Sequence, residues 1–125
     1  MAEPFGVVLL SGTHDRAHYA FVLATGAAAL GRAVTLFASN AGCRALMADW
    51  GSLDDAGRDA VVTARGVAGL DVLREVAAEL GVRLIACEAG LRSEAIAPER
   101  LLATVEVAGV ATFLEAVRGG QIITC

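Results

Sequence analysis

Cys87 is the residue whose type and position best suit chemistry in this sequence. It ends the mostly apolar run Arg83 to Cys87, and a segment containing Gly90 follows. Such a run is typical of a buried parallel strand, so we expect Cys87 at the carboxyl end of a strand, where open α/β sheets collect ligands and reactive groups. Helix N-termini at that edge favour the thiolate, the nucleophilic form. The alternative is a small apolar side chain that fills the strand end.

Cys43 and Cys125 are the two other thiols in the chain. The sequence contains no C-x-x-C pair, so neither a thioredoxin-type motif nor a zinc knuckle is indicated. We expect Cys43 to begin a short helix at the same sheet edge, where it receives sulfur from Cys87 or is simply buried. Cys125 is either a mobile terminal thiol or an incidental cysteine on an ordered strand.

His14 and His18 are four residues apart and are expected on one face of a helix. A metal site would need a third ligand, and the sequence has no H-E-x-x-H, so we expect no metal. His14 opens the first helix at the edge where Cys87 lies. It could bond the Cys87 thiolate or a bound anion there, and the alternative is a solvated histidine at a helix start.

Loop residues at this edge complete the candidate pocket. The backbone N–H groups of the segment 11–13 precede a helix and could hold a small sulfur oxyanion, although an ordinary N-cap at Thr13 is the alternative. Nucleotide binding is not supported, because there is no G-x-G-x-x-G or Walker pattern. The carboxylate of Glu88 would oppose a thiolate if it pointed inward. The pocket residues that we expect beside Cys87 are Ser11, Gly12, Thr13, His14, Asn40, Cys43 and Glu88.

The elements that must position these residues alternate along the chain. Apolar runs predict four buried strands at 6–10, 33–38, 83–87 and 121–124. Helical spacing predicts helices at about 14–30, 43–49, 70–80, 98–105 and 110–117, with a loop and a short helix over 50–66. The helix at 14–30 is apolar almost all round, which is typical of burial on both sides. The order predicts a parallel sheet with helices on both faces, as one domain over residues 1–125.

The composition restricts the class of protein. A net charge of −4, the absence of a basic patch and only 5% aromatic residues argue against nucleic-acid binding. The chain is 56% hydrophobic, with a mean hydropathy of +0.61, which indicates either a membrane segment or a second buried face in an oligomer. The longest apolar stretch, 19–30, is shorter than the ~20 residues of a membrane span, and no signal peptide is recognisable. We therefore expect a cytoplasmic homo-oligomer, in which Glu106 pairs with an arginine at a subunit contact.

Four segments resemble the DsrE/DsrF-like family, namely 15–20, 31–37, 86–91 and 106–114. The resemblance runs over nearly the whole chain and implies a three-layer α/β/α fold with a mainly parallel sheet of about five strands. It also implies trimers or hexamers. The best-studied members carry sulfur as a persulfide on a cysteine after a central strand, the place that Cys87 occupies. The local sequence Glu88-Ala89-Gly90 departs from the commonest one in the sulfur-oxidation members, and some members lack the cysteine, so the fold alone does not establish an activity.

Two functions of different classes follow from these observations. The first is a sulfur carrier or sulfurtransferase-like protein, which holds a persulfide on Cys87, needs no cofactor, and exchanges sulfur with a donor or acceptor protein or a small sulfur oxyanion. The second is a non-catalytic binding or assembly module of the same fold, in which Cys87 only packs. A thiol peroxidase is disfavoured because no Thr-x-x-Cys precedes this position.

Overall fold

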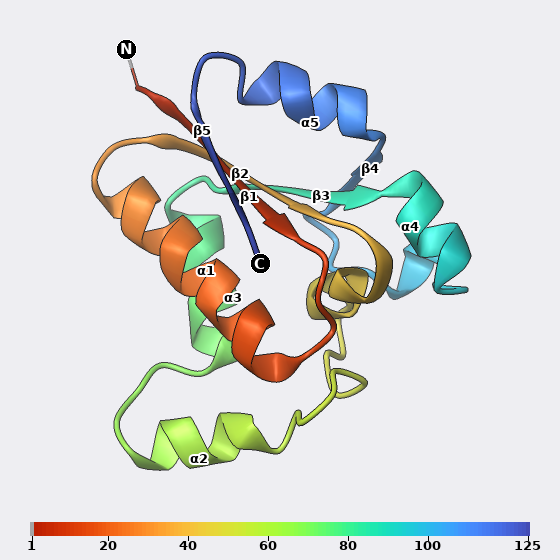
Figure 1. The fold of residues 1–125 in the computed structure, drawn as a ribbon. Coiled ribbons are helices and arrows are strands. Elements are labelled where there is room, and N and C mark those ends of the chain that lie inside the picture. The colour runs from red at the N-terminus through yellow and green to blue at the C-terminus, as the bar shows by residue number, and fades with distance from the viewer. Residues whose placement is uncertain (1) are drawn as a thin grey trace.

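A computed structural model describes residues 2–125 and shows one parallel sheet between helices (Figure 1). The strands, in the spatial order β4-β3-β2-β1-β5, are β1 (Pro4–Leu9), β2 (Ala33–Ala38), β3 (Arg83–Cys87), β4 (Glu106–Ala108) and β5 (Gln121–Thr124), and all neighbouring pairs are parallel. The α-helices are α1 (His14–Ala29), α2 (Arg58–Ala64), α3 (Leu70–Glu79), α4 (Glu88–Ser93) and α5 (Val110–Ala116). Two 3₁₀ helices, η1 (Asn40–Leu46) and η2 (Pro98–Arg100), complete the chain. The predicted α/β class is confirmed.

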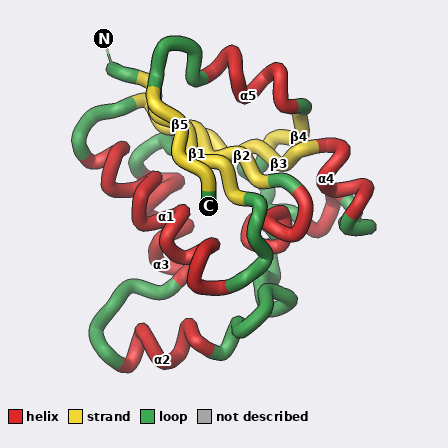
Figure 2. The backbone as a smooth tube through the Cα atoms, viewed as in Figure 1, coloured by secondary structure: helices red, strands yellow, loops and turns green. Residues whose placement is uncertain are grey.

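The two faces of the sheet are covered unequally (Figure 2). Leu36 and Ala38 of β2 belong to a large cluster of buried residues that includes residues of α1 and α3. Phe37, between them, belongs to a second cluster with Phe113 and Val117 from the α5 region. Successive side chains of a strand point to opposite faces, so both faces of β2 are buried. This explains the continuous apolar run in the sequence.

Helix α1 is buried on one side, not all round. Small side chains such as Ala17, Ala20 and Ala24 are fully buried against the body, which lets the helix approach its neighbours closely. On the other side Tyr19 is 57% exposed, and Leu30, just after the helix, is 81% exposed. Within residues 2–125, none of the helices has the length and apolar character needed to cross a membrane.

The segment 98–105 is not the helix that the sequence predicts. Pro98 begins only the three-residue η2, and the chain then forms the edge strand β4, in which Ala108 lies opposite Cys87. Glu106 makes two hydrogen bonds to Arg83 across the β3–β4 pair, at 2.6 and 2.8 Å. The expected intersubunit partner of Glu106 is therefore an arginine of the same chain. A strand of three residues is too short for its apolar alternation to be recognised, so the apolar runs predicted four strands, whereas residues 2–125 form five, the number that the family resemblance implied.

Two further segments depart from the predicted boundaries. The helix expected at 43–49 is the 3₁₀ helix η1, which begins three residues earlier at Asn40, where φ is +52°. The loop expected after Cys87 is the short helix α4. The stretch 50–66 does contain a loop and the short helix α2, as predicted.

Candidate functional site

The helices η1 and α4, which follow β2 and β3, meet at the carboxyl edge of the sheet. Glycines allow their backbones to come into contact there. A Cβ atom on Gly42 would lie 2.2 Å from the carbonyl oxygen of Leu9, so η1 rests directly on the end of β1. A Cβ atom on Gly90 would lie 2.6 Å from the backbone nitrogen of Asn40, so α4 rests on the start of η1. No larger side chain fits at either position without displacing the backbone. The two cysteine-bearing segments are therefore held together at this edge.

Cys87 lies at the end of β3, and it is also the residue that immediately precedes α4. Its side chain is half-buried and packs against the cluster of Phe37, Ile85, Phe113 and Val117, with Ala108 as a further neighbour. Cys87 therefore lies at the carboxyl edge, on the side of the sheet that α5 covers. This is the place that the sequence pattern indicated for a reactive thiol.

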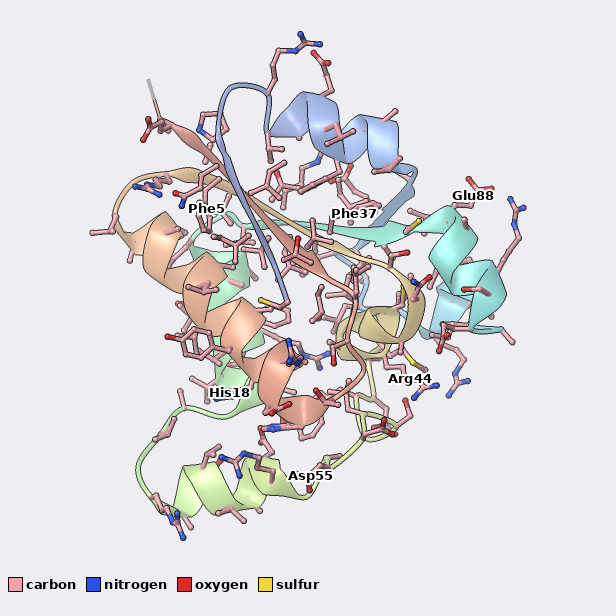
Figure 3. The ribbon with its side chains drawn as sticks, viewed as in Figure 1. Phe5, His18, Phe37, Arg44, Asp55 and Glu88 are labelled. Atoms are coloured by element: carbon pink, nitrogen blue, oxygen red, sulfur yellow. The ribbon has the colours of Figure 1, made fainter. Side chains whose placement is uncertain are left out.

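Glu88 does not point toward the interior of the site. Its carboxylate is 59% exposed and forms an ion pair with Arg92, one turn further along α4. Figure 3 shows Glu88 on the outer side of α4. Its negative charge is therefore balanced at the surface by Arg92.

Cys43 lies beneath the same edge but is fully buried. Its sulfur is 3.5 Å from the carbonyl oxygen of Ala38. The pKa of Cys43 is raised to about 12, chiefly by burial and in part by the negative charge of a Cys87 thiolate, while the backbone N–H of Cys87 offsets part of the rise. Cys43 is thus brought close to Cys87, as a protonated thiol with no access to solvent.

Cys125 is part of an ordered strand end, so the mobile-arm alternative is not what the structure shows. Its N–H donates to the carbonyl oxygen of Val8 at 2.7 Å, and its own carbonyl oxygen accepts from the N–H groups of Leu10 and Ser11. Burial raises the pKa of its thiol, although the charge of Arg16 lowers it in part. All three cysteines are free thiols.

His14 is neither solvated nor bonded to Cys87. It is 1% exposed, and its Nε2 lies 2.8 Å from Oδ1 of Asp59. The ring of His18 stacks on it with 5.6 Å between centroids and donates from Nε2 to the carbonyl oxygen of Ala68. Asp59 was missed from the sequence because it is 45 residues away. Among residues 2–125, no group of three or more His, Cys, Asp or Glu side chains is arranged to hold a metal ion.

Two of the three backbone donors proposed for an anion at residues 11–13, those of Ser11 and Thr13, are already bonded within the chain. The N–H of Thr13 donates to Oγ of Ser11 at 3.2 Å, and the N–H of His14 donates to the carbonyl oxygen of Asp54 at 2.8 Å. The hydroxyl of Thr13 donates to Asp15 instead of capping α1. Gly12 packs against Ala41 of η1. The loop is thus a structural contact, and the N–H groups of Ser11, Thr13 and His14 are not free for a ligand.

The fold and its edge define a class of α/β protein with a five-stranded parallel sheet and a half-buried cysteine after a strand next to the edge strand β4. No family model matches the chain. The chain is similar to the uncharacterized protein YrkE of Bacillus subtilis (strain 168), with 28% identity over 93% of this chain and 92% of that protein.

Solved structures share the fold over essentially their whole length. The ychN protein from E. coli superposes with a TM-score of 0.67 at 12% identity and covers 100% of both chains. The protein of unknown function MTH1491 from Methanobacterium thermoautotrophicum has a TM-score of 0.59 at 18% identity and covers 98% of this chain and 99% of its own. At these identities the likeness shows the fold and does not extend to an activity.

Proposed function

We propose that this protein is a cytoplasmic sulfur carrier of the DsrE/DsrF-like type that holds sulfur as a persulfide on Cys87. The observation that supports this proposal most directly is the half-buried position of the Cys87 thiol at the carboxyl end of β3. Burial raises the pKa of both other thiols, Cys43 and Cys125, so neither is a good source of thiolate. A reducing compartment would keep the carrier thiol free between transfers.

The proposed loading step is a displacement at sulfur. The Cys87 thiolate attacks the outer sulfur of thiosulfate, the S–S bond of thiosulfate breaks, and its electron pair leaves with sulfite. A persulfide anion remains on Cys87, so charge and atoms balance without an added oxidant or reductant. In unloading, an acceptor thiolate attacks the outer persulfide sulfur and releases the Cys87 thiolate. The partial exposure of Cys87 at the sheet edge supports access by a donor and an acceptor.

Mass spectrometry of the intact protein tests this function. After incubation with thiosulfate, and separately with polysulfide, we expect a gain of one or more sulfur atoms that dithiothreitol removes. The gain should persist in Cys43→Ser and Cys125→Ser and be absent in Cys87→Ser. The proposal fails if the wild-type protein gains no sulfur from either donor, or if Cys87→Ser still gains it.

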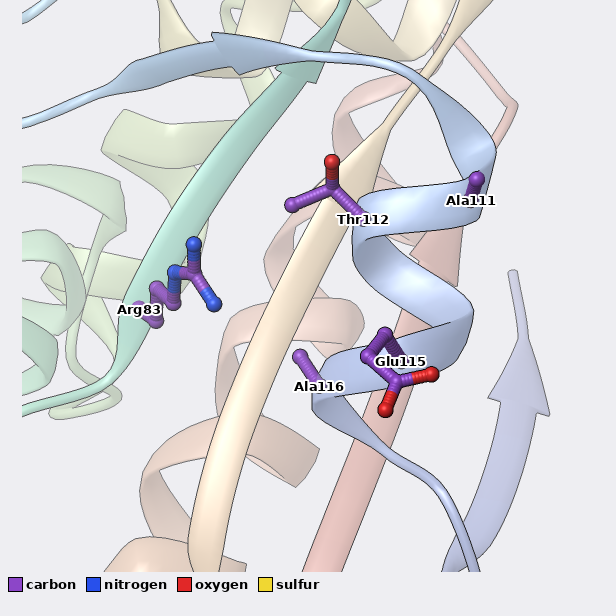
Figure 4. A pocket seen from close by; sticks show the side chains of 5 residues that line it. All are labelled: Arg83, Ala111, Thr112, Glu115 and Ala116. Carbon is purple, nitrogen blue, oxygen red and sulfur yellow. The ribbon is translucent and has the colours of Figure 1, made fainter.

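An exposed apolar surface favours the second candidate, an assembly module. Val110 and Leu114 of α5 are 56% and 52% exposed, and Val107 of β4, the strand that leads into α5, is 42% exposed. A cavity of about 430 Å³ opens between α5 and β3 (Figure 4), lined by Arg83, Ala111, Thr112, Glu115 and Ala116. Large side chains left exposed together are typical of surfaces that meet another protein. On this candidate function the protein is a homo-oligomer, a trimer or hexamer as the family resemblance implies.

Light scattering coupled to gel filtration distinguishes the two candidates. The assembly function predicts an oligomer that Leu114→Asp dissociates and Cys87→Ser leaves intact, with slow labelling of Cys87. The matched control is Glu115→Gln, on the same helix, because it changes an exposed carboxylate and removes no apolar surface. A wild-type protein that is monomeric at micromolar concentration contradicts the assembly function and leaves the carrier function to the sulfur assay.

A further inference from the structure

Residues 57–68 form a segment that buries no side chain. The segment contains α2, and none of its residues is buried. Val61 and Val67 are 45% and 47% exposed. The segment therefore buries little apolar side-chain area against the rest of the protein. Figure 1 shows α2 set apart from the sheet on the far side of α1. Burial of apolar area therefore contributes little to keeping the segment in place.

Polar contacts attach the segment to the rest of the protein instead. Oδ1 of Asp59 accepts hydrogen bonds from Nε2 of His14 at 2.8 Å and from the N–H of Leu70 at 2.9 Å. At the far end of the segment, the carbonyl oxygen of Ala68 accepts from Nε2 of His18 at 2.7 Å. Both side-chain donors are on α1, one turn apart. The segment is thus joined to α1 by two histidines, of which His14 is the buried one.

The closed arrangement leaves one buried polar atom without a partner. The carboxylate of Asp59 accepts, so Nε2 of His14 carries the proton, and a neutral ring then leaves Nδ1 as a lone-pair acceptor. Nδ1 is buried and has no hydrogen-bond partner among the described residues. An unpaired buried polar atom costs free energy, so His14 is less favourably placed than its hydrogen bond to Asp59 alone indicates.

A cavity separates the segment from α1. Its volume is about 270 Å³, and it is lined by His14, Asp15, His18, Tyr19, Arg58 and Val62. Glycines flank α2, and the backbone at Gly66 has a positive φ of +81°. Gly57 and Gly69 bound the segment. Glycine adopts many backbone conformations at little steric cost, so the connections on either side of α2 can change without strain in the helix.

We propose that residues 57–68 are a flap that opens away from α1 and closes onto it, and that the hydrogen bond between His14 and Asp59 is its latch. Closing shields His14 and encloses the cavity between α1 and α2. Opening breaks the hydrogen bond between His14 and Asp59 and exposes the cavity to solvent. The flap is independent of the sulfur chemistry proposed for Cys87, because none of its attachments lies on β3 or α4.

Native-state amide hydrogen exchange of the full chain, measured by NMR, tests the flap. We expect the amides of α2 to exchange at least about tenfold faster than those of β1 and β2 in the wild-type protein, because local opening needs less free energy than global unfolding. Asp59→Ala should accelerate α2 by about tenfold more, while the strand amides change less. Asp59→Asn retains an oxygen that accepts from His14 and should restore most of the protection.

Arg65→Ala is the matched control, since it lies on the same segment, is exposed, and should leave the exchange of α2 unchanged. Three results would overturn the proposal. The first is α2 exchanging together with β1 and β2 in the wild-type protein. The second is Asp59→Ala behaving like Arg65→Ala. The third is Asp59→Ala accelerating α2 and the strands by the same factor, which would make Asp59 a contributor to global stability and not a latch.

Discussion

Cys43 and Cys87 approach the same end of β3 from opposite faces of the sheet. Cys43 belongs to the large cluster on the side of α1 and α3, and Cys87 packs on the side of α5. The backbone N–H of Cys87 faces the Cys43 sulfur and partly offsets the rise in its pKa. The two thiols are therefore electrostatically coupled but face different environments. This arrangement favours one exchangeable thiol with a second, protonated one beneath it.

The difference in environment predicts an order of alkylation. At pH 8, a pKa of about 12 for Cys43 leaves about one molecule in ten thousand as the thiolate, the form that reacts. We expect iodoacetamide to label Cys87 first, Cys125 more slowly, and Cys43 only after unfolding, as followed by peptide mass spectrometry. Labelling in urea is the control, because all three should then react at similar rates. Labelling of Cys43 before Cys87 in the folded protein would contradict the geometry described above.

Cys43 also predicts a loss of stability in alkali. Its folded pKa is raised from 9.0 to about 12, with burial as the chief cause. Because the folded pKa is raised, Cys43 loses its proton at a lower pH in the unfolded chain than in the folded protein. Its contribution to the free energy of unfolding is therefore fully present below pH 9 and is lost as the pH rises toward 12. Urea unfolding between pH 8 and pH 11 should show a steeper decline for the wild-type protein than for Cys43→Ala. Equal slopes would show that Cys43 is not the group responsible.

The sequence predicted the strands best where both faces are buried. The segments 33–38 and 83–87 are continuous apolar runs because each side of them meets a buried cluster. β4 escaped prediction because three residues, one of them the exposed Glu106, carry too little periodicity. α4 escaped because Gly90 has a low helix propensity, and the contact of Gly90 with Asn40 is a tertiary one.

Only the part of the site that depends on a single strand could be predicted from the sequence. The position of Cys87 follows from where β3 ends, and that needs no knowledge of other segments. The partner of His14 depends instead on how residues 50–69 fold back onto α1, and no local pattern around Asp59 encodes that contact. The N–H groups of Ser11 and His14 likewise donate to carbonyl oxygens of remote segments, those of Cys125 and Asp54.

Arg74 is predicted to stabilise the end of η1 through hydrogen bonds to the backbone. Its guanidinium donates to the carbonyl oxygens of Ala45, Met47 and Ala48 at 3.2, 2.6 and 3.2 Å. Its side chain is only 9% exposed, so Arg74→Met would leave buried carbonyls unpaired and should cost about 2 kcal/mol of unfolding free energy. Urea denaturation measures this loss. Arg65→Met, at an exposed arginine, should change stability by less than about 0.5 kcal/mol, and a similar loss in both variants would contradict the role of Arg74.

Two glycine-to-alanine substitutions should change stability in opposite directions. At Gly42 the added Cβ would lie 2.2 Å from the carbonyl oxygen of Leu9, so η1 must move away from β1, and we expect a loss of about 3 kcal/mol. At Gly26, in the middle of α1, the added Cβ meets no atom within 4 Å, and alanine should stabilise the helix by about 0.5 to 1 kcal/mol. Thermal and urea unfolding of both variants measure these changes. Because the substitution is the same, a loss in both would show that α1 does not tolerate alanine at Gly26, and a neutral Gly42→Ala would show that η1 does not rest on the end of β1.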